Sequence, residues 1–433
     1  MTRSSSTSPD LQGAPWLARP HVQHLLELLS PEGEETRCVG GCVRDTLAGS
    51  VAGDVEVDMA TTLLPEAVLA RLEAAGIRAV ATGLEHGTVT AVMRLPDTAP
   101  GKTGKPRDDK YEITTLRRDI SGDGRHAEVA FGRDWREDAL RRDLTINAVY
   151  ADRHGTVYDP VGSGLEDIAA RRVRFIGDPA QRIREDYLRI LRFVRFYFRL
   201  SPDVAPDVAT VAAITHASAD IAALSGERRQ DEFLKILALG EVEKALGFLA
   251  KVGALDPTLG GAGAWNFARL SALVAQEKHL PERATPLVRL AALMPDAQSG
   301  AAVAASLRLS RRRTQRLGIA LDHAGADLAQ RPRHWLHYAG APSVSDQTVM
   351  ALADGQISTG DAVDLLAQAE AWEPRRFPLR GHDMTAAGVP EGPEMGRILA
   401  DLEAWWVAQD FPPKQAVAAE FRRRWPGNDE NSQ

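Results

Sequence analysis

The amino-acid sequence predicts an α/β head followed by an all-helical remainder. Up to about residue 160, short apolar runs alternate with polar residues as strands do, whereas from about residue 165 onward helical periodicity dominates. The chain has 433 residues, of which 44% are hydrophobic, so it can bury substantial cores and divide into about two to four domains. We expect a head at 16–160, a helical neck at 161–250 and a helical body and tail at 251–427, with the ends 1–15 and 428–433 disordered.

Hydrophobic patterns in the head predict five strands and two helices. The strands are expected at Arg37–Val39, Val55–Met59, Ile77–Ala81, Thr88–Met93 and Tyr111–Leu116, and the helices at His21–Ser30 and Pro65–Ala75. Proline, glycine and mixed charge predict a surface loop at about 96–110. Behind the head, periodic apolar residues predict helices at 183–200, 227–240, 241–255 and 361–373.

Composition limits the classes of function. The net charge is 52 − 59 = −7, which argues against a general polyanion binder, although local basic patches can still bind nucleic acid. The sequence contains no apolar run of about 18 residues, the length that a membrane span needs. The polar start is not followed by an apolar segment, so we expect a cytoplasmic protein. Cys38 and Cys42 lack the four-ligand count of a structural zinc site, and we expect them to be buried thiols.

The most informative stretch lies at 54–58, where Asp54, Glu56 and Asp58 alternate with apolar residues. Strict alternation is a strand pattern, so the three carboxylates are expected on one face of a strand. Negative charge concentrated in this way is relieved by cations. The pattern is that of a site that holds two metal ions for phosphoryl transfer.

A glycine pair, Gly40-Gly41, precedes these acids and follows an apolar strand pattern. Two glycines allow a tight strand-to-helix turn whose backbone N–H groups can approach a phosphate closely. Arg44, one turn into the expected helix, can add a bidentate contact, whereas Asp45 is expected to stabilise the local structure. The spacing lacks the third glycine of a dinucleotide-binding fingerprint, which excludes that class.

Several motifs then follow one another in chain order: GGCVRD, an acidic pair before MATT, YEITTLRRD, DGRH, RRDLTINA, DPVGSGLEDI, REDYLRILRFVRF and LSGERRQDEFLKIL. Their order resembles that of the bacterial-type (class II) CCA-adding tRNA nucleotidyltransferases and poly(A) polymerases. The resemblance spans roughly residues 35–245 and extends weakly to 381–399, which is similar to the tail of the CCA-adding members. It implies a nucleotidyltransferase head with a mixed sheet like that of DNA polymerase beta, and a helical neck, body and tail, of which the body and tail bind tRNA.

The resemblance also implies a metal-binding pair of acids one residue apart, the second followed by x-Ala-Thr. Asp58 fits the second acid and Glu56 the first, where most relatives carry Asp. Counting forward from Gly41 would instead select Asp54 and Glu56, so Asp54 is an alternative ligand. Glu112 is a candidate third carboxylate, and a surface or ion-paired role is its alternative.

The expected chemistry follows from these parts. Two Mg²⁺ ions held by the carboxylates would bridge the nucleotide phosphates and the attacking 3′-hydroxyl, and pyrophosphate would leave. Arg141 and Arg142 are candidate contacts to the triphosphate or ribose, with simple ion pairing as the alternative. The resemblance implies that Asp143 and Asn147 help to shape the nucleotide pocket.

A helix expected at about 184–199 carries the remaining candidates. Asp186 and Arg189 lie one turn apart, so an acceptor and a donor share a face. This pair can bind the Watson–Crick edges of C and A but not those of U and G. In the resembling family such a protein template selects CTP and ATP, and Arg192 and Arg195 would then contact the triphosphate.

Addition of CCA to tRNA 3′ ends is the leading hypothesis. A poly(A) polymerase is the first alternative, but those members usually carry a Gly-basic-basic-Phe stretch where this chain has residues 83–86, GLEH. An inactive RNA-binding relative is the second. Addition of only CC or only A also stays open, although DGRH at 123–126 lies in a loop that full CCA-adding members keep, which favours full addition.

Overall fold

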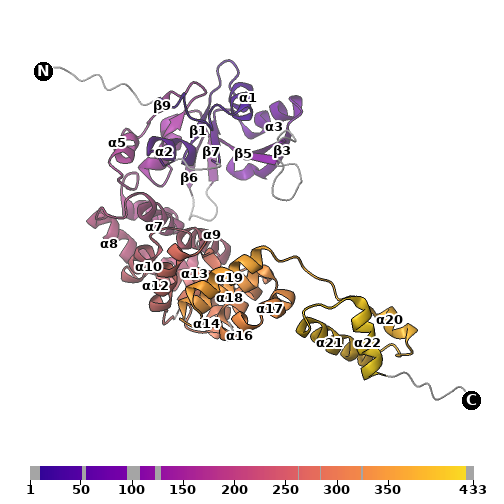
Figure 1. Cartoon of the computed structure of the whole chain (residues 1–433). Helices are drawn as coiled ribbons and strands as arrows, with labels where there is room; N and C mark the ends of the chain where they lie inside the picture. Colours follow the sequence, from indigo (N-terminus) through magenta and orange to yellow (C-terminus); the bar gives the residue numbers. More distant parts are fainter. Residues whose placement is uncertain are drawn as a thin grey trace, which may run out of the picture. The chain divides into compact units, whose positions relative to one another are not determined.

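The computed structural model describes residues 10–50, 55–94, 108–121, 128–261, 263–282, 284–322 and 325–425 (Figure 1). The chain forms two compact units, the first ending at Leu259 and the second beginning at Gly260. The first unit contains an α/β head and several helices that follow it, and the second unit is helical. Among the helices described, none has the length and apolar character needed to cross a membrane.

A mixed sheet forms the centre of the head, with seven strands among the described residues in the order β3-β4-β5-β2-β1-β8-β9. The strands β2 and β5 pair in parallel, and the other neighbours pair antiparallel. Their bounds are β1 (Thr36–Val39), β2 (Asp58–Thr61), β3 (Arg78–Gly83), β4 (Thr88–Arg94), β5 (Asp108–Thr115), β8 (Tyr150–Ala151) and β9 (Val157–Tyr158). A separate hairpin pairs β6 (Arg117–Ser121) with β7 (Glu128–Phe131).

The helices of the head begin where the sequence offers a suitable first turn. Both α1 (Pro20–Leu28) and α3 (Pro65–Ala74) begin with proline, whose fixed φ suits that position. The side chain of Asp134 accepts hydrogen bonds from two backbone N–H groups at the start of α4 (Trp135–Leu140). The remaining helices of the head are α2 (Gly41–Leu47) and α5 (Gly164–Ala169).

The strands and helices expected in the head are present, with four differences from the expectation. The strand expected at Val55–Met59 begins only at Asp58, because its partner β1 has four residues and pairs them with Asp58–Thr61. The loop expected at 96–110 is wrong for its last three residues, which belong to β5, and its other residues lie outside the described part. The hairpin of β6 and β7, the short strands β8 and β9, and the helices α4 and α5 were not expected.

The fourth point concerns the N-terminus. Asp10 forms a bridge with Thr156, and the backbone N–H of Leu11 donates to Gly155 O at 2.9 Å. Leu11 and Ala14 are buried. The disorder expected for 1–15 is therefore wrong for residues 10–15, and residues 1–9 lie outside the described part, as does the expected C-terminal disorder at 428–433.

Helices make up the rest of the chain, as expected from its periodicity. Those of the first unit are α6 (Pro179–Glu185), α7 (Leu188–Leu200), α8 (Val208–Ala217), α9 (Gly226–Leu237), α10 (Val242–Lys251) and α11 (Leu255–Leu259). Those of the second are α12 (Phe267–Gln276), α13 (Pro286–Leu293), α14 (Ala297–Ser306), α15 (Arg311–Leu321), α16 (Gly325–Gln330), α17 (Pro332–Ala339), α18 (Ala341–Ala353), α19 (Thr359–Glu370), α20 (Gly381–Ala386), α21 (Pro393–Ala408) and α22 (Lys414–Arg424).

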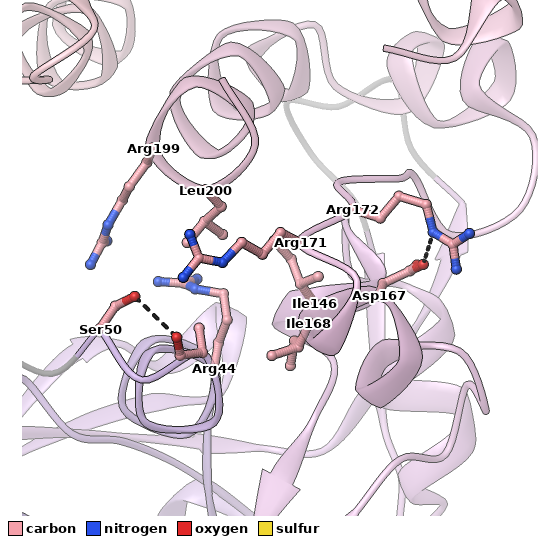
Figure 2. A pocket seen from close by; sticks show the side chains of 10 residues that line it. Arg44, Ser50, Ile146, Asp167, Ile168, Arg171, Arg172, Arg199 and Leu200 are labelled. Atoms are coloured by element: carbon pink, nitrogen blue, oxygen red, sulfur yellow. Dashed lines mark hydrogen bonds and ion pairs between the residues drawn. The ribbon is translucent and has the colours of Figure 1, made fainter. Parts of the chain in front are cut away.

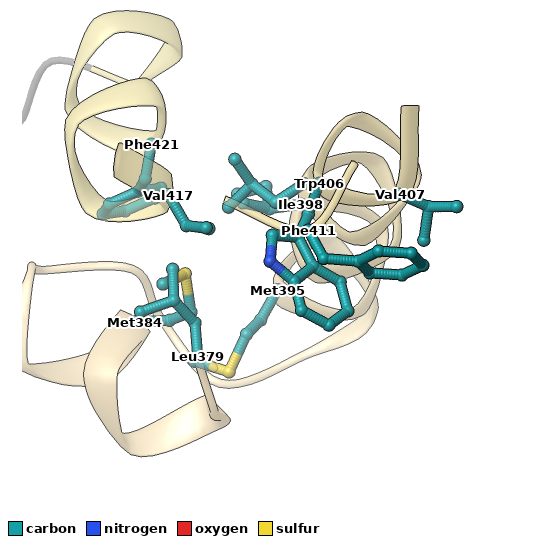
Figure 3. Packing of buried hydrophobic residues seen from close by; sticks show 10 residues of the cluster. Leu379, Met384, Met395, Ile398, Trp406, Val407, Phe411, Val417 and Phe421 are labelled. Carbon is teal, nitrogen blue, oxygen red and sulfur yellow. The ribbon is translucent and has the colours of Figure 1, made fainter. Parts of the chain in front are cut away.

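The C-terminal helices enclose an apolar cluster of their own (Figure 3). Trp406 is 4% exposed, and its ring meets that of Phe411 edge-on with the ring centroids 4.8 Å apart. The indole N–H of Trp406 donates to Pro412 O at 2.8 Å, which satisfies its polar atom. Trp406 is therefore a core residue of this unit.

Candidate functional site

A cleft of about 820 Å³ in the first unit brings the sequence-predicted residues together. It is lined by residues of the head and of the helices α7 and α9. The candidates that line it are Gly40, Gly41, Arg44, Glu56, Asp58, Arg141, Arg142, Asp143, Asn147, Asp186, Arg189, Arg192 and Arg195. Of the two other candidates, Glu112 lies beside the cleft and Asp54 lies outside the described residues.

The glycine turn and the acidic strand are neighbours because β1 and β2 pair antiparallel. Val39, the last residue of β1, lies opposite Asp58, the first residue of β2, so the turn after β1 begins beside the carboxylate. Gly40 has φ +76°, a backbone conformation that favours glycine, and it precedes the first turn of α2. Gly40 and Gly41 line the same cleft as Asp58.

The carboxylates repel one another in the way the sequence predicts. In the parallel pairing of β2 with β5, Met59 lies opposite Ile113, so Asp58 and Glu112 are neighbours on adjacent strands. Asp58 is exposed to the cleft, but neighbouring protein atoms exclude part of the water around its carboxylate. This desolvation, and after it the charges of Glu112 and Glu56, raise the pKa of Asp58 to about 6. A cation bound here would relieve that repulsion.

The carboxylates do not form a closed metal cage. Within the described ranges, no three side chains of the types that bind metals lie close enough to form a ligand set by themselves. An open site of this kind fits Mg²⁺, which usually binds one or two carboxylates together with substrate phosphates and water. Glu56 and Asp58 are two neighbouring carboxylates of the cleft with the chemistry to hold it.

A chain of hydrogen bonds connects α2 to α7 through the short helix η2 (Thr145–Asn147). Arg44 donates to Asn147 Oδ1 at 2.6 Å, and the amide of Asn147 donates to Asp143 Oδ1 at 3.1 Å. Asp143 in turn accepts from Arg192 Nε at 2.6 Å. Burial opposes ionisation of Asp143, but Arg192 and the hydrogen bonds lower its pKa to about 2. Four candidates are therefore held as one rigid network.

A buried carboxylate that the sequence reasoning missed supports Arg141 and Arg142. Asp138 on α4 is 1% exposed and accepts from Arg141 Nε at 2.9 Å, from Arg142 at 3.0 Å and from the hydroxyl of Tyr150 at 2.8 Å. Burial works against its ionisation, but the two arginines lower its pKa to about 2. The spacing was a usable signal, because Asp138 precedes the arginines by three and four residues.

The expected continuous helix at 184–199 is wrong. The helix α6 ends at Glu185, Asp186 adopts an extended backbone with φ −161°, and α7 begins at Leu188. The side chain of Asp186 accepts from Leu188 N at 3.1 Å, which is the local hydrogen bond by which Asp competes with a continuing helix. Asp186 and Arg189 therefore both line the cleft, but not from one helix face: Asp186 lies between α6 and α7, and Arg189 lies in the first turn of α7.

These two residues already have partners in the structure. Asp186 pairs with Arg228 of α9 at 2.7 Å. Arg189 pairs with Glu185 at 2.5 Å and donates to the carbonyls of Arg182 and Arg141 at 3.0 and 3.2 Å. The carbonyl contacts fix the guanidinium at the cleft wall.

The helix α9 supplies further cleft residues to which the sequence reasoning gave no role. Arg228 and Lys235 both line the cleft, and Glu232, on the same helix, pairs with Arg195. Their spacing along the chain is that of one helix face, which was the available signal. Arg117, Phe196 and Arg199 line the cleft as well, so it combines a strongly basic wall with a few carboxylates.

Outside the cleft, the two cysteines are buried thiols, as the sequence predicts. Burial raises the pKa of Cys42 to about 12, so this thiol stays protonated and unreactive at neutral pH.

Comparisons with known proteins agree with this arrangement. Residues 36–174 match the family model of the poly A polymerase head domain, and residues 203–261 match the "probable RNA and SrmB- binding site of polymerase A". The CCA tRNA nucleotidyltransferase 1, mitochondrial, of Danio rerio is 34% identical over 390 residues, which cover 88% of this chain and 85% of that protein. The CCA-adding enzyme of Levilactobacillus brevis is 30% identical over 436 residues, covering 93% and 96%.

Solved structures with this fold include that of the Bacillus stearothermophilus CCA-adding enzyme in complex with CTP. It superposes with a TM-score of 0.69 at 28% identity and covers 95% of this chain and 98% of that one. A Thermotoga maritima CCA-adding enzyme complexed with tRNA shares the fold with a TM-score of 0.56 at 17% identity.

Proposed function

The chain belongs to the CCA tRNA nucleotidyltransferase family of enzymes, and from that premise we propose that it adds CCA to tRNA 3′ ends from CTP and ATP without a nucleic-acid template. One observation carries the proposal. A single cleft contains the carboxylates of β2, the glycine turn of α2, the paired Arg141 and Arg142, and the acceptor and donor of Asp186 and Arg189.

Glu56 and Asp58 would hold two Mg²⁺ ions, with Glu112 as a third carboxylate beside Asp58. Bound there, the ions would lower the pKa of the attacking 3′-hydroxyl and stabilise charge on the phosphates. Asp54 is the alternative ligand of the pair. The fit rests on the raised pKa of Asp58, because carboxylates that resist ionisation together need positive charge between them.

The basic wall of the cleft would bind the triphosphate. The backbone N–H groups after Gly40 and Gly41 would donate hydrogen bonds to a phosphate at the start of α2. Arg141 and Arg142, held by Asp138, would present their guanidinium groups to the phosphates or the ribose. Arg44, Asp143, Asn147 and Arg192 would act as the rigid network behind them, with Arg195 beside it.

Selection of the base would depend on Asp186 and Arg189. The Asp186 carboxylate would accept from the exocyclic amino group of C or A, and the Arg189 guanidinium would donate to the adjacent ring nitrogen. Binding would exchange the ion pair of Asp186 with Arg228 for the contact to the base. The solved CTP complex of a relative supports a nucleotide in this fold.

The tRNA would be bound by the helical body and tail, 251–427. Two observations support this proposal: this part of the chain is helical, and a CCA-adding enzyme with the same fold has been solved in complex with tRNA.

A poly(A) polymerase is the second candidate, because the head-domain model that matches residues 36–174 carries that description. The relatives that match most of the chain are named for CCA addition, which favours the leading proposal.

Incorporation of each NTP into labelled tRNAs that end before CCA, after C or after CC tests the proposal. We expect CTP alone to add two residues and ATP to add one residue only after CC. Addition of many A residues to any RNA would identify a poly(A) polymerase, and a halt at CC or activity only with ATP would identify a partial enzyme. No incorporation in Mg²⁺ would contradict the proposal in favour of an inactive RNA-binding relative.

A further inference from the structure

A second, smaller cavity of about 40 Å³ lies beside the large cleft (Figure 2). It shares Arg44, Ser50 and Arg199 with the cleft and is otherwise lined by Ala48 after α2, by Ile146 of η2, and by residues of α5, α7 and the turn after α5. A cavity needs about 10–15 Å³ of such volume for one water, so this one has room for about three waters. That is the size of one small oxyanion and is too small for a nucleotide.

Arginines dominate the polar lining. The side chains of Arg44, Arg171 and Arg199 reach the cavity from three different segments of the chain, and the Arg171 guanidinium extends toward that of Arg44 (Figure 2). Arg44 is 3% exposed and sits at the base, whereas Arg171 and Arg199 are exposed at the mouth. Guanidinium groups in such an arrangement match the geometry of a phosphate or sulfate.

The negative charges nearby do not balance these arginines. Asp45 is shared, since one oxygen accepts from Arg44 at 2.8 Å and the other pairs with Arg199 at 2.7 Å. Burial lowers the pKa of Arg44, Asp45 opposes this, and the charge of Arg199 adds to the lowering. For Arg171, the part of the chain that the structure describes contains no acidic partner within ion-pair distance.

The acid on the other wall is already neutralised. Asp167 is fully buried and pairs with Arg172 at 2.9 Å and with Arg174 at 2.8 Å. The hydroxyl of Thr145 donates to it at 2.7 Å. It therefore supplies no free negative charge to the cavity.

Arg171 also has an unusual backbone conformation. Its φ is +49°, in the left-handed region where glycine is favoured. It occupies the turn that ends α5, with Arg171 N donating to Ile168 O at 3.1 Å and Arg172 N donating to Asp167 O at 2.7 Å. The hydroxyl of Ser201 also donates to Arg171 O. This backbone conformation, which favours glycine, places the Arg171 side chain in the lining of the cavity.

We propose that this side pocket binds one phosphate-sized oxyanion between Arg44, Arg171 and Arg199. The anion would be either free inorganic phosphate or one end of pyrophosphate, which share this chemistry. The proposal concerns binding alone and does not depend on the reaction assigned above.

Isothermal titration of the full-length protein with inorganic phosphate and with pyrophosphate, at ionic strength held constant with chloride, tests it. The variants are Arg171→Gly, which removes the cation and relieves the backbone, and Arg171→Lys, which keeps the charge. Arg184→Ala is the matched control, because Arg184 is an exposed arginine of the same unit that lines neither cavity.

We expect Arg171→Gly to weaken phosphate binding at least tenfold or to abolish one of two binding sites, Arg171→Lys to weaken it less, and Arg184→Ala to leave it unchanged. If Arg171→Gly also weakens the binding of pyrophosphate, pyrophosphate is identified as an occupant of the pocket. If Arg171→Gly binds each anion as tightly as the wild type does, the proposal is overturned, because the anions then bind only in the large cleft.

Discussion

Replacing Asp138 by asparagine tests whether the arginine pair of the cleft depends on a buried carboxylate. The change keeps the shape of the side chain and removes the charge that Arg141 and Arg142 share. Because asparagine cannot accept from both guanidinium groups and from the Tyr150 hydroxyl as a carboxylate does, the arginines should lose their fixed orientation.

The size of the effect follows from the pKa. The pKa of Asp138 is about 2 in the folded protein, against 3.8 as its ordinary value. A difference of roughly two units corresponds to about 2–3 kcal/mol at neutral pH, at about 1.4 kcal/mol per unit. Because the folded-state pKa is lowered, this stability is present above pH 4 and is lost as the pH falls toward 2, so roughly half of it remains at pH 3.

The assay is urea denaturation of the full chain at pH 7 and pH 3, with nucleotide KM measured separately. We expect Asp138→Asn to lower the free energy of unfolding by about 2–3 kcal/mol at pH 7 and by about half as much at pH 3. The KM for CTP and ATP should rise about tenfold, the equivalent of about 1.4 kcal/mol, with the preference for these bases kept.

Glu137→Gln is the matched control, because Glu137 is the exposed neighbour on α4 and loses the same charge. It should change neither quantity. A free energy of unfolding and a KM for Asp138→Asn equal to those of the control would refute the reasoning.

Three further predictions concern the base pocket, the carboxylates and the second unit. In single-nucleotide incorporation, the double variant of Asp186→Ala and Arg189→Ala should accept UTP or GTP, since a mismatch there is worth roughly 1–3 kcal/mol; unchanged selection would place discrimination elsewhere. Because the pKa of Asp58 is about 6, protons should compete with Mg²⁺ below that pH, so Mg²⁺ should raise the melting temperature more at pH 7.5 than at pH 5; equal shifts would contradict the assignment. Arg289→Met should lower the free energy of unfolding measured in urea by about 3–5 kcal/mol, because it removes the guanidinium that lies 2.6 Å from the buried carboxylate of Glu277. Replacing both residues by apolar ones should restore most of the lost stability. A single variant as stable as the wild type would be inconsistent with this pair.

Local patterns were sufficient to predict most elements of the head. Alternating burial persists along 55–59, with Val57 and Met59 buried and Glu56 and Asp58 exposed, although the hydrogen-bonded strand begins only at Asp58. An extended chain alternates its side chains whether or not a neighbouring strand is present. Where the ladder begins depends on β1, which is too short to pair with the earlier residues.

The break at Asp186 could not be derived from periodicity, because the apolar pattern continues across it. What breaks the helix is the hydrogen bond from Leu188 N to the Asp186 side chain. An Asp before a periodic run is a helix-start signal, and that reading would have placed the junction correctly.

The site residues were predictable as a set, but their pairings were not. Each candidate sits in a local motif, whereas the contacts join distant segments, as between Arg44 and Asn147 or between Asp186 and Arg228. Such pairings are set by tertiary packing, such as that of α9 on α7, which a single sequence read locally does not contain. Asp54 and the DGRH segment at 123–126 lie outside the described residues, so the predictions made for them stay predictions.

The central claim is that the carboxylates of β2 perform nucleotidyl transfer, and the most direct measurement is the turnover of Asp58→Ala on tRNA that ends before CCA, with CTP, ATP and Mg²⁺. The account predicts that Asp58→Ala and Glu56→Ala each lower kcat by orders of magnitude while the fold is kept, and that Asp54→Ala lowers it much less. Full activity of Asp58→Ala together with loss of activity in Asp54→Ala would contradict the account and move the metal site two residues toward the N-terminus.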